Sequence, residues 1–194
     1  MFPILISIIA ITIMIALWLV STQRRLVLLD ENINNAMNQI GVQISGRFDA
    51  LIALLDLTKG FAGHESEILI KNIKSKRGII TAKSSPDDVV KQEGIILEAL
   101  GRISMVSEQY PELKANHNYI KMMDAVKTFE NMVRTSRLIY NHSVTKLNRD
   151  IRMFPVSMVA GILGFSQRDY LEDQKAKTEI QEEFDVKKKP LLRI

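Results

Sequence analysis

The residues that could perform acid–base or metal chemistry in this sequence are few and scattered. It has three histidines, His64, His117 and His142, and no cysteine. Glu65 follows His64, but the second histidine of a helical zinc site is missing. The surrounding GFAGHE follows no predicted strand and lacks phosphate-loop spacing, so its glycines favour a helix-ending turn. We therefore expect no catalytic residue, no metal site and no cofactor, and we predict that the chain is not an enzyme.

Three scattered histidines also do not predict a Ser-His-Asp arrangement. The alternative that stays open is an enzyme whose polar groups converge between helices.

Contact with a lipid surface or a partner is the second chemistry that the residues favour. Residues 116–165 hold the whole net charge of +4, and an uncharged run, FPVSMVAGILGF, occupies 154–165. Anionic headgroups attract basic residues by about 1 kcal/mol each. The uncharged run is too short to span a bilayer. The candidate membrane or partner contacts are Lys146, Arg149, Arg152, Phe154, Met158, Ile162 and Phe165.

Each half of this candidate site has an alternative interpretation. The basic residues could be a solvated face that complements the negative end of a helix. The uncharged run could close the base of a helical core instead of entering a membrane interface. Basic helices without interleaved aromatic residues predict no nucleic-acid partner.

The first 23 residues contain no charged side chain, although the chain has 26 basic and 22 acidic residues. Residues 2–20 would span about 28 Å as a helix, close to the thickness of a bilayer's hydrocarbon core. A cleaved signal peptide is the main alternative, but a basic region before the apolar run and a small-x-small cleavage site are both missing. A buried helix of a soluble protein would rarely stay uncharged for so long. We therefore predict an uncleaved, single-pass anchor at 1–23.

Arg24 and Arg25 follow the anchor directly. Positive-inside reasoning places the rest of the chain in the cytoplasm, and the extracytoplasmic orientation stays open because two arginines are a small bias.

The remainder has helical periodicity throughout. Apolar residues recur every three or four positions between Leu26 and Leu55, and again between Tyr119 and Ile151. Between these long patterns, one pattern runs to about Lys83, and another starts at the capping sequence at 85–88 and ends before Pro111. The sequence thus predicts an all-α fold, with a bundle at 24–165 and a charged, mostly disordered tail at 166–194.

Helix lengths predict the topology of this bundle. Two long helices of about 57 Å enclose two shorter ones, and short loops favour antiparallel neighbours. The last long helix should therefore return to the membrane and bring 154–165 beside the anchor.

Several long motifs make the sequence resemble the LemA family of bacterial, membrane-anchored helical proteins. They are LVLLDENINNAMNQIGVQ (26–43), GRFDALIALLDLTKGFAGHE (46–65), YPELKANHNYIKM (110–122), FENMVRTSRLIYNHSVTKLN (129–148) and FPVSMVAGILGF (154–165). The chain departs from the family at 46–54, where the usual doubly basic, proline-containing stretch is absent.

The resemblance implies a single-pass anchor with the amino terminus outside, an antiparallel four-helix bundle and no established catalytic activity. It supplies no molecular role. The partners we expect are membrane lipid through the anchor and a protein of unknown identity, and association with a second copy stays open. The leading hypothesis is a non-enzymatic scaffold or adaptor, and the alternative is a membrane-organising or envelope-stress protein that contacts lipid.

Overall fold

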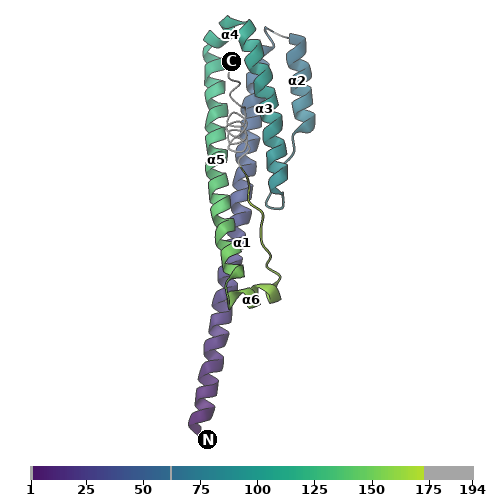
Figure 1. Ribbon diagram of the computed structural model, residues 1–194. Helices are drawn as coiled ribbons and strands as arrows, with labels where there is room; N and C mark the ends of the chain where they lie inside the picture. The colour runs from purple at the N-terminus through teal and green to yellow at the C-terminus, as the bar shows by residue number, and fades with distance from the viewer. Residues whose placement is uncertain (1, 62, 173–194) are drawn as a thin grey trace, which may run out of the picture.

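The computed structural model describes residues 2–61 and 63–172, and these residues form helices joined by short connections (Figure 1). The helices are α1 (Phe2–Thr58), α2 (Gly63–Lys76), α3 (Pro86–Gln109), α4 (Pro111–Ala115), α5 (His117–Arg152) and α6 (Val156–Leu163). The described part of the chain contains no strand, so the predicted all-α class is confirmed.

The apolar N-terminal segment and the first helix of the body form one uninterrupted helix. α1 has 57 residues, which corresponds to about 85 Å. Its N-terminal part is apolar enough to cross a membrane, and none of that part is buried. α5 runs antiparallel to the rest of α1, α3 packs beside α1, and α2 packs against α1 and α3 (Figure 1). An N-terminal apolar helix of this kind suggests a membrane anchor.

The helices bury the apolar stripes that the sequence predicts. Along α1 the fully buried side chains recur at steps of three and four, and they include Leu26, Ile40, Ile44, Phe48, Leu51 and Leu55. Val144 and Leu147 of α5 are also fully buried. These residues belong to one hydrophobic core that continues into α3 and α6. The stripes therefore direct α1 and α5 toward each other.

The second helix is shorter than the sequence pattern indicates. The pattern continues to about Lys83, but α2 ends at Lys76 and residues 77–85 form a loop. The Gly78 N–H donates to Oε1 of the buried Gln92 side chain on α3 at 2.7 Å. Arg77 donates to Asp49 Oδ1 on α1 at 2.6 Å. These tertiary contacts satisfy the backbone and side chains of the loop, so they replace another turn of helix.

Two glycines of α1 allow close approach of other parts of the chain. A Cβ atom on Gly41 would lie 2.2 Å from the backbone oxygen of Ile80 in the 77–85 loop. A Cβ atom on Gly46 would lie 2.4 Å from Cε1 of Phe129 on α5. The cost of glycine in a helix, about 1 kcal/mol against alanine, is thus offset by packing that a side chain would prevent.

The start of α3 agrees with the capping signal in the sequence. Ser85 is the N-cap residue, and its Oγ accepts from the Asp88 N–H at 3.2 Å while Asp88 Oδ2 accepts from the Ser85 N–H at 2.8 Å. The Ser85 N–H and the Ser85 hydroxyl both donate to Asp88 Oδ2, and they hold the pKa of Asp88 below its ordinary value because they stabilise the ionised carboxylate. Local chemistry alone therefore fixes this helix boundary.

After α6 the chain continues along the body of the molecule in an extended segment. Residues 166–172 fall in the part of the sequence predicted to be a charged, mostly disordered tail, and the structure packs them against α5 and α1. Leu171 is 1% exposed and belongs to the hydrophobic core. The rest of the predicted tail, residues 173–194, lies outside the described residues.

Candidate functional site

The uncharged run at 154–165 forms a short helix at the end of the body from which the apolar part of α1 extends. Pro155 precedes α6, and Gly164 ends it in a left-handed conformation with φ of 76°. α6 packs against both α1 and α5 (Figure 1). The predicted return of the last long helix, which brings 154–165 beside the apolar helix, is therefore confirmed.

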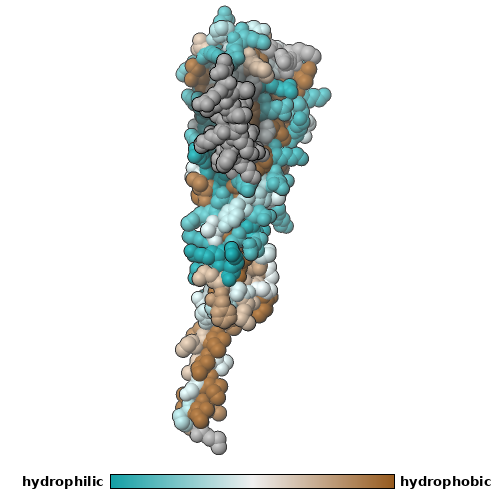
Figure 2. Space-filling view, viewed as in Figure 1, coloured by the Kyte–Doolittle hydropathy of each residue, from teal (hydrophilic) through white to brown (hydrophobic). Residues whose placement is uncertain are grey.

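α6 divides its apolar residues between the core and the surface. Val159 and Ala160 are buried. Met158 and Ile162 are 62% and 85% exposed, and they lie four positions apart, so they share one side of the helix. Phe154, just before the helix, is 80% exposed. Figure 2 shows hydrophobic surface along the N-terminal helix and at the level of α6, below a mostly hydrophilic body. The sequence left core closure and contact with lipid or a partner as alternatives; the structure buries one side of the helix in the core and leaves the other side exposed.

The remaining predicted contact residues flank this exposed face. Lys146, Arg149 and Arg152 are exposed near the end of α5. Phe165 is half-buried and packs against the core, so its ring closes the base of the body. The structure thus brings the basic residues and the apolar face to one end of the molecule. Contact of these residues with lipid or a partner remains a prediction.

A carboxylate that sequence reasoning did not single out fixes this end of α5 to α1. The Asp150 side chain is 6% exposed, and its Oδ2 lies 2.8 Å from Nε of Arg25. Arg149 Nε lies 3.7 Å from the other oxygen, Oδ1. Arg25 directly follows the predicted anchor, so this ion pair ties the end of α5 to the position where the apolar part of α1 ends.

Two asparagines of α5 hold the extended segment that follows α6. Asn148 Oδ1 accepts from the Arg168 N–H and Asn148 Nδ2 donates to the Arg168 carbonyl, both at 2.9 Å. Asn141 makes the same pair of bonds with Leu171, at 2.8 Å and 2.9 Å. This role of the two asparagines was not predicted from the sequence. A sequence signal did exist, because the two amides recur seven residues apart and so lie on one side of the helix.

Buried charges lie farther from the apolar end, between α1, α3 and α5. Arg47 is 3% exposed and donates to Glu130 Oε2 at 2.9 Å, and Arg137 pairs with Glu93. Burial lowers the pKa of Arg47 from its ordinary value, and the charges of Glu130 and Glu93 partly offset this. Glu93 lies within the apolar pattern of the third predicted helix, and a charge in a core stripe is a signal for such a pair. The arrangement joins three helices by paired charges.

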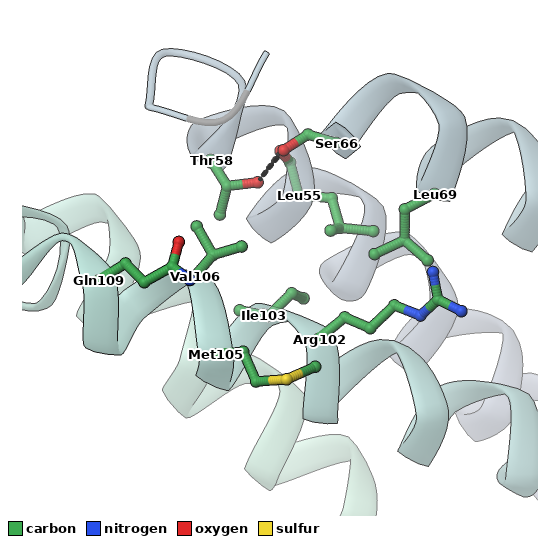
Figure 3. Close-up of a pocket in the computed structure, with 9 residues that line it drawn as sticks. All are labelled: Leu55, Thr58, Ser66, Leu69, Arg102, Ile103, Met105, Val106 and Gln109. Atoms are coloured by element: carbon green, nitrogen blue, oxygen red, sulfur yellow. Dashed lines mark hydrogen bonds between the residues drawn. The ribbon is translucent and has the colours of Figure 1, made fainter. Parts of the chain in front are cut away.

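A pocket of about 120 Å³ lies at the distal end of the body, between the end of α1, α2 and α3 (Figure 3). The hydroxyl groups of Thr58 and Ser66 are hydrogen-bonded to each other, with Thr58 Oγ1 and Ser66 Oγ 2.9 Å apart. Arg102 on the rim pairs with Glu98 of its own helix at 3.1 Å. Leu55, Leu69, Ile103 and Val106 supply an apolar lining. These residues do not present a nucleophile beside a base.

His117 and His142, the histidines whose side chains the structure describes, are not brought together. His117 and His142 are exposed at different turns of α5, and His64 is in the first turn of α2. The described residues contain no group of three or more His, Cys, Asp or Glu side chains placed to hold a metal ion.

Comparison with known proteins gives related sequences. The model of the LemA family matches residues 36–186. Protein LemA of Metamycoplasma hominis is 30% identical over 135 residues, which are 68% of this chain and 60% of that protein. Magnetosome protein MamQ 2 of Paramagnetospirillum magneticum is 33% identical over 78 residues, which are 40% of this chain and 29% of that protein. Magnetosome protein MamQ of Magnetospirillum gryphiswaldense is 31% identical over a stretch of the same length. The matches thus span less than two thirds of these relatives.

Proposed function

Because the chain belongs to the LemA family, and most of its described residues are helical, with an exposed apolar N-terminal segment, we propose that it is a non-enzymatic, membrane-anchored scaffold or adaptor. The observation that carries the proposal is the continuity of α1. One helix supplies both the apolar segment and a full side of the core, from Leu26 to Leu55. A body joined to its anchor without a flexible linker holds its surface at a defined distance from the membrane.

In this proposal α1, α2, α3 and α5 act as an antiparallel four-helix body on a single membrane span. Arg24 and Arg25 after the span favour a cytoplasmic body by the positive-inside rule, and the opposite orientation is the alternative. The buried polar groups support a non-enzymatic role. Arg47 and Arg137 are engaged with carboxylates inside the body, so they do not form an open, water-accessible site.

In-cell proximity labelling tests the scaffold proposal. A labelling enzyme is fused to each end of the full chain in turn, and residues 1–35 with the same enzyme serve as the anchor-only control. The full chain should enrich specific neighbours over the control, and the compartment of the labelled proteins should differ between the two ends. Identical sets from the full chain and the anchor-only control would contradict the proposal.

The exposed side of α6 supports a second candidate function, direct contact of the body with lipid. Phe154, Met158 and Ile162 form an apolar face beside the point where the apolar segment of α1 ends, and basic residues flank it. A short helix with one apolar side and neighbouring cations is the type of element that lies in a membrane interface. Such contact would let the protein organise the membrane around its anchor.

Fluorescence quenching by brominated lipids tests this contact directly. The chain has no cysteine, so Ile162→Cys provides a single site for a fluorophore. Ile79→Cys is the matched control, because both isoleucines are strongly exposed, at 85% and 88%, and Ile79 lies in the distant 77–85 loop. In vesicles with brominated acyl chains the dye at 162 should be quenched and the dye at 79 should not. Equal quenching at both positions would remove this candidate function.

Charge reversal measures the part played by the cations. Arg149→Glu together with Arg152→Glu should reduce quenching at 162 in vesicles of anionic lipid and leave it unchanged in neutral vesicles. An unchanged signal in anionic vesicles would show that the basic residues are only a solvated face.

A further inference from the structure

The extended segment after α6, residues 166–172, lies against α5 and also contacts α1. We refer to the surface of these two helices that it covers as the groove. The backbone of the segment makes five hydrogen bonds with side chains of α5, from Tyr140, Asn141 and Asn148. Arg168 also pairs with Asp30 of α1 at 2.8 Å. The segment therefore contacts both long helices, and it lies over the line along which they meet. We refer to residues 166–172 as the strap.

The asparagines bind the strap as a β-strand binds its neighbour. Each side-chain amide accepts a hydrogen bond from the N–H of one strap residue and donates one to the carbonyl of the same residue. Asn148 does so with Arg168, and Asn141 with Leu171. Seven residues of helix advance about 10.5 Å, and three residues of extended chain advance about 10 Å. The spacing of the two amides thus matches the repeat of an extended peptide, and the match does not depend on the peptide's side chains.

The groove selects two side chains in addition to the backbone. Leu171 is buried in the core, and Arg168 pairs with Asp30, whereas the side chains of the other strap residues are exposed. The peptide that fits is therefore extended and has a basic residue followed three positions later by an aliphatic one. Most of its other side chains are unconstrained.

α1 and α5 also pack against each other well beyond the part that the strap covers, since Arg47 pairs with Glu130 and Gly46 lies against Phe129. Ile33 and Met37 of α1 and Val144 and Leu147 of α5 belong to the common core and are almost completely buried. The strap itself contributes one buried side chain, Leu171. It is joined to α6 through Gly164, whose left-handed conformation ends the helix. Release of the strap would thus remove few core contacts and leave the two helices paired.

We propose that this groove is a binding site for an extended peptide of a partner protein, and that the strap occupies it in the resting chain. The ligand is a segment with a basic residue at the Arg168 position and an aliphatic residue at the Leu171 position. The inference rests on the proposed adaptor function, because it specifies the kind of partner that an adaptor of this shape would capture. Competition between strap and partner makes the apparent affinity depend on the fraction of chains with a free groove.

A peptide-binding assay tests the groove without knowledge of the partner. The probe is a fluorescent synthetic peptide of residues 166–172, SQRDYLE, and fluorescence anisotropy measures its binding to the full chain in detergent or nanodiscs. The change Leu171→Asp in the chain alters the strap and leaves the groove intact. It should tighten binding of the probe by about 10-fold or more, because it raises the fraction of open grooves. A control peptide with aspartate at the position of Leu171 should not bind.

Variants of the groove test whether Asn141 and Asn148 bind the probe peptide. Asn141→Leu with Asn148→Leu, in the chain that also carries Leu171→Asp, should abolish binding of the probe, while the helical circular dichroism is retained. Failure of the probe to bind the Leu171→Asp chain would overturn the proposal, and so would binding that survives the asparagine changes. If Leu171→Asp prevents folding, Arg168→Ala weakens the strap without placing a charge in the core, and the same comparison applies.

A dye on the strap reports displacement in the otherwise unaltered chain. Asp169→Cys places a single thiol on the exposed side of the strap, and addition of the unlabelled probe peptide should change the dye's emission. A similar change on addition of unlabelled full chain would identify a second copy as the occupant and overturn the assignment to a separate partner. If the probe binds but proximity labelling finds no specific neighbours, the peptide-binding groove is supported and the adaptor function is contradicted. If proximity labelling finds specific neighbours but the probe does not bind, the adaptor function is supported and the peptide-binding groove is contradicted.

Discussion

The interior of the α1–α5 pair and its end near the apolar segment place charge and apolar surface in opposite ways. In the interior of the body, farther from the apolar segment, Arg47 and Arg137 are buried and paired with carboxylates of α5 and α3. At the end near the apolar segment, Lys146, Arg149 and Arg152 are exposed, and so is the apolar face of α6. The interior of the body therefore contains paired charges, whereas the proximal surface contains apolar side chains.

The difference indicates what surrounds each region. Buried ion pairs are costly unless their geometry is complete, so these pairs favour one register of α1, α3 and α5 in a body surrounded by water. Exposed Phe154 and Ile162 are unfavourable in water and favourable beside hydrocarbon. Changes at the buried ion pairs should consequently alter the free energy of unfolding, and changes on the proximal surface should alter lipid contact.

The largest expected effect on stability is at the buried ion pairs. Arg137→Met leaves the partly buried Glu93 carboxylate without its main partner, and we expect the free energy of unfolding to fall by about 3 kcal/mol. Urea unfolding followed by circular dichroism measures the change. Arg137→Met with Glu93→Met should recover most of the loss, because an apolar pair replaces the ionic one. A single variant as stable as the original chain would show that the pair contributes nothing.

The next effect is at the close contact between α1 and the 77–85 loop. Gly41→Ala places a Cβ atom against the Ile80 carbonyl, and we expect a net loss of about 1–3 kcal/mol despite the better helix propensity of alanine. Gly101→Ala is the control, because its Cβ atom would meet nothing within 4 Å. It should stabilise the chain by up to about 1 kcal/mol. Thermal unfolding of both variants gives the comparison, and two stabilising substitutions would contradict the packing argument.

A smaller effect is expected at the strap. Asn148→Ala removes both hydrogen bonds to Arg168, and we expect a loss of about 1–2 kcal/mol. Hydrogen exchange should accelerate at the Arg168 amide and less at the Leu171 amide, which Asn141 still holds. Equal acceleration at both amides would contradict this expectation, because it would mean that the whole strap is released when the hydrogen bonds of Asn148 are lost.

The smallest effect on stability is expected on the exposed side of α6. Phe154→Ser with Ile162→Ser should change the free energy of unfolding in detergent by no more than about 0.5 kcal/mol, and should reduce association with lipid vesicles. Val159→Ser on the buried side of the same helix is the matched control, and it should destabilise the body because it places a hydroxyl in the core. Equal destabilisation by both changes would show that both sides of α6 serve the core.

Much of the fold follows from local sequence patterns. The apolar segment, the buried stripes of α1 and α5 and the capping box at Ser85 and Asp88 all depend on residues a few positions apart, and the structure has each of them. The predicted extension of the second helix to Lys83 was wrong, because contacts of Arg77 and Gly78 with α1 and α3 decide where that helix ends.

The sequence by itself determined the family, the all-helical class and the apolar N-terminal helix, since periodicity and motif order are properties of the chain. Only the tertiary structure decided which side of α6 is buried, which asparagines hold the strap and which arginines enter the core. Arg47 and Glu130 are 83 positions apart in the sequence. Their pairing depends on the register in which α1 and α5 pack, and that register is set by the fit of side chains into places such as Gly46, which no local pattern specifies.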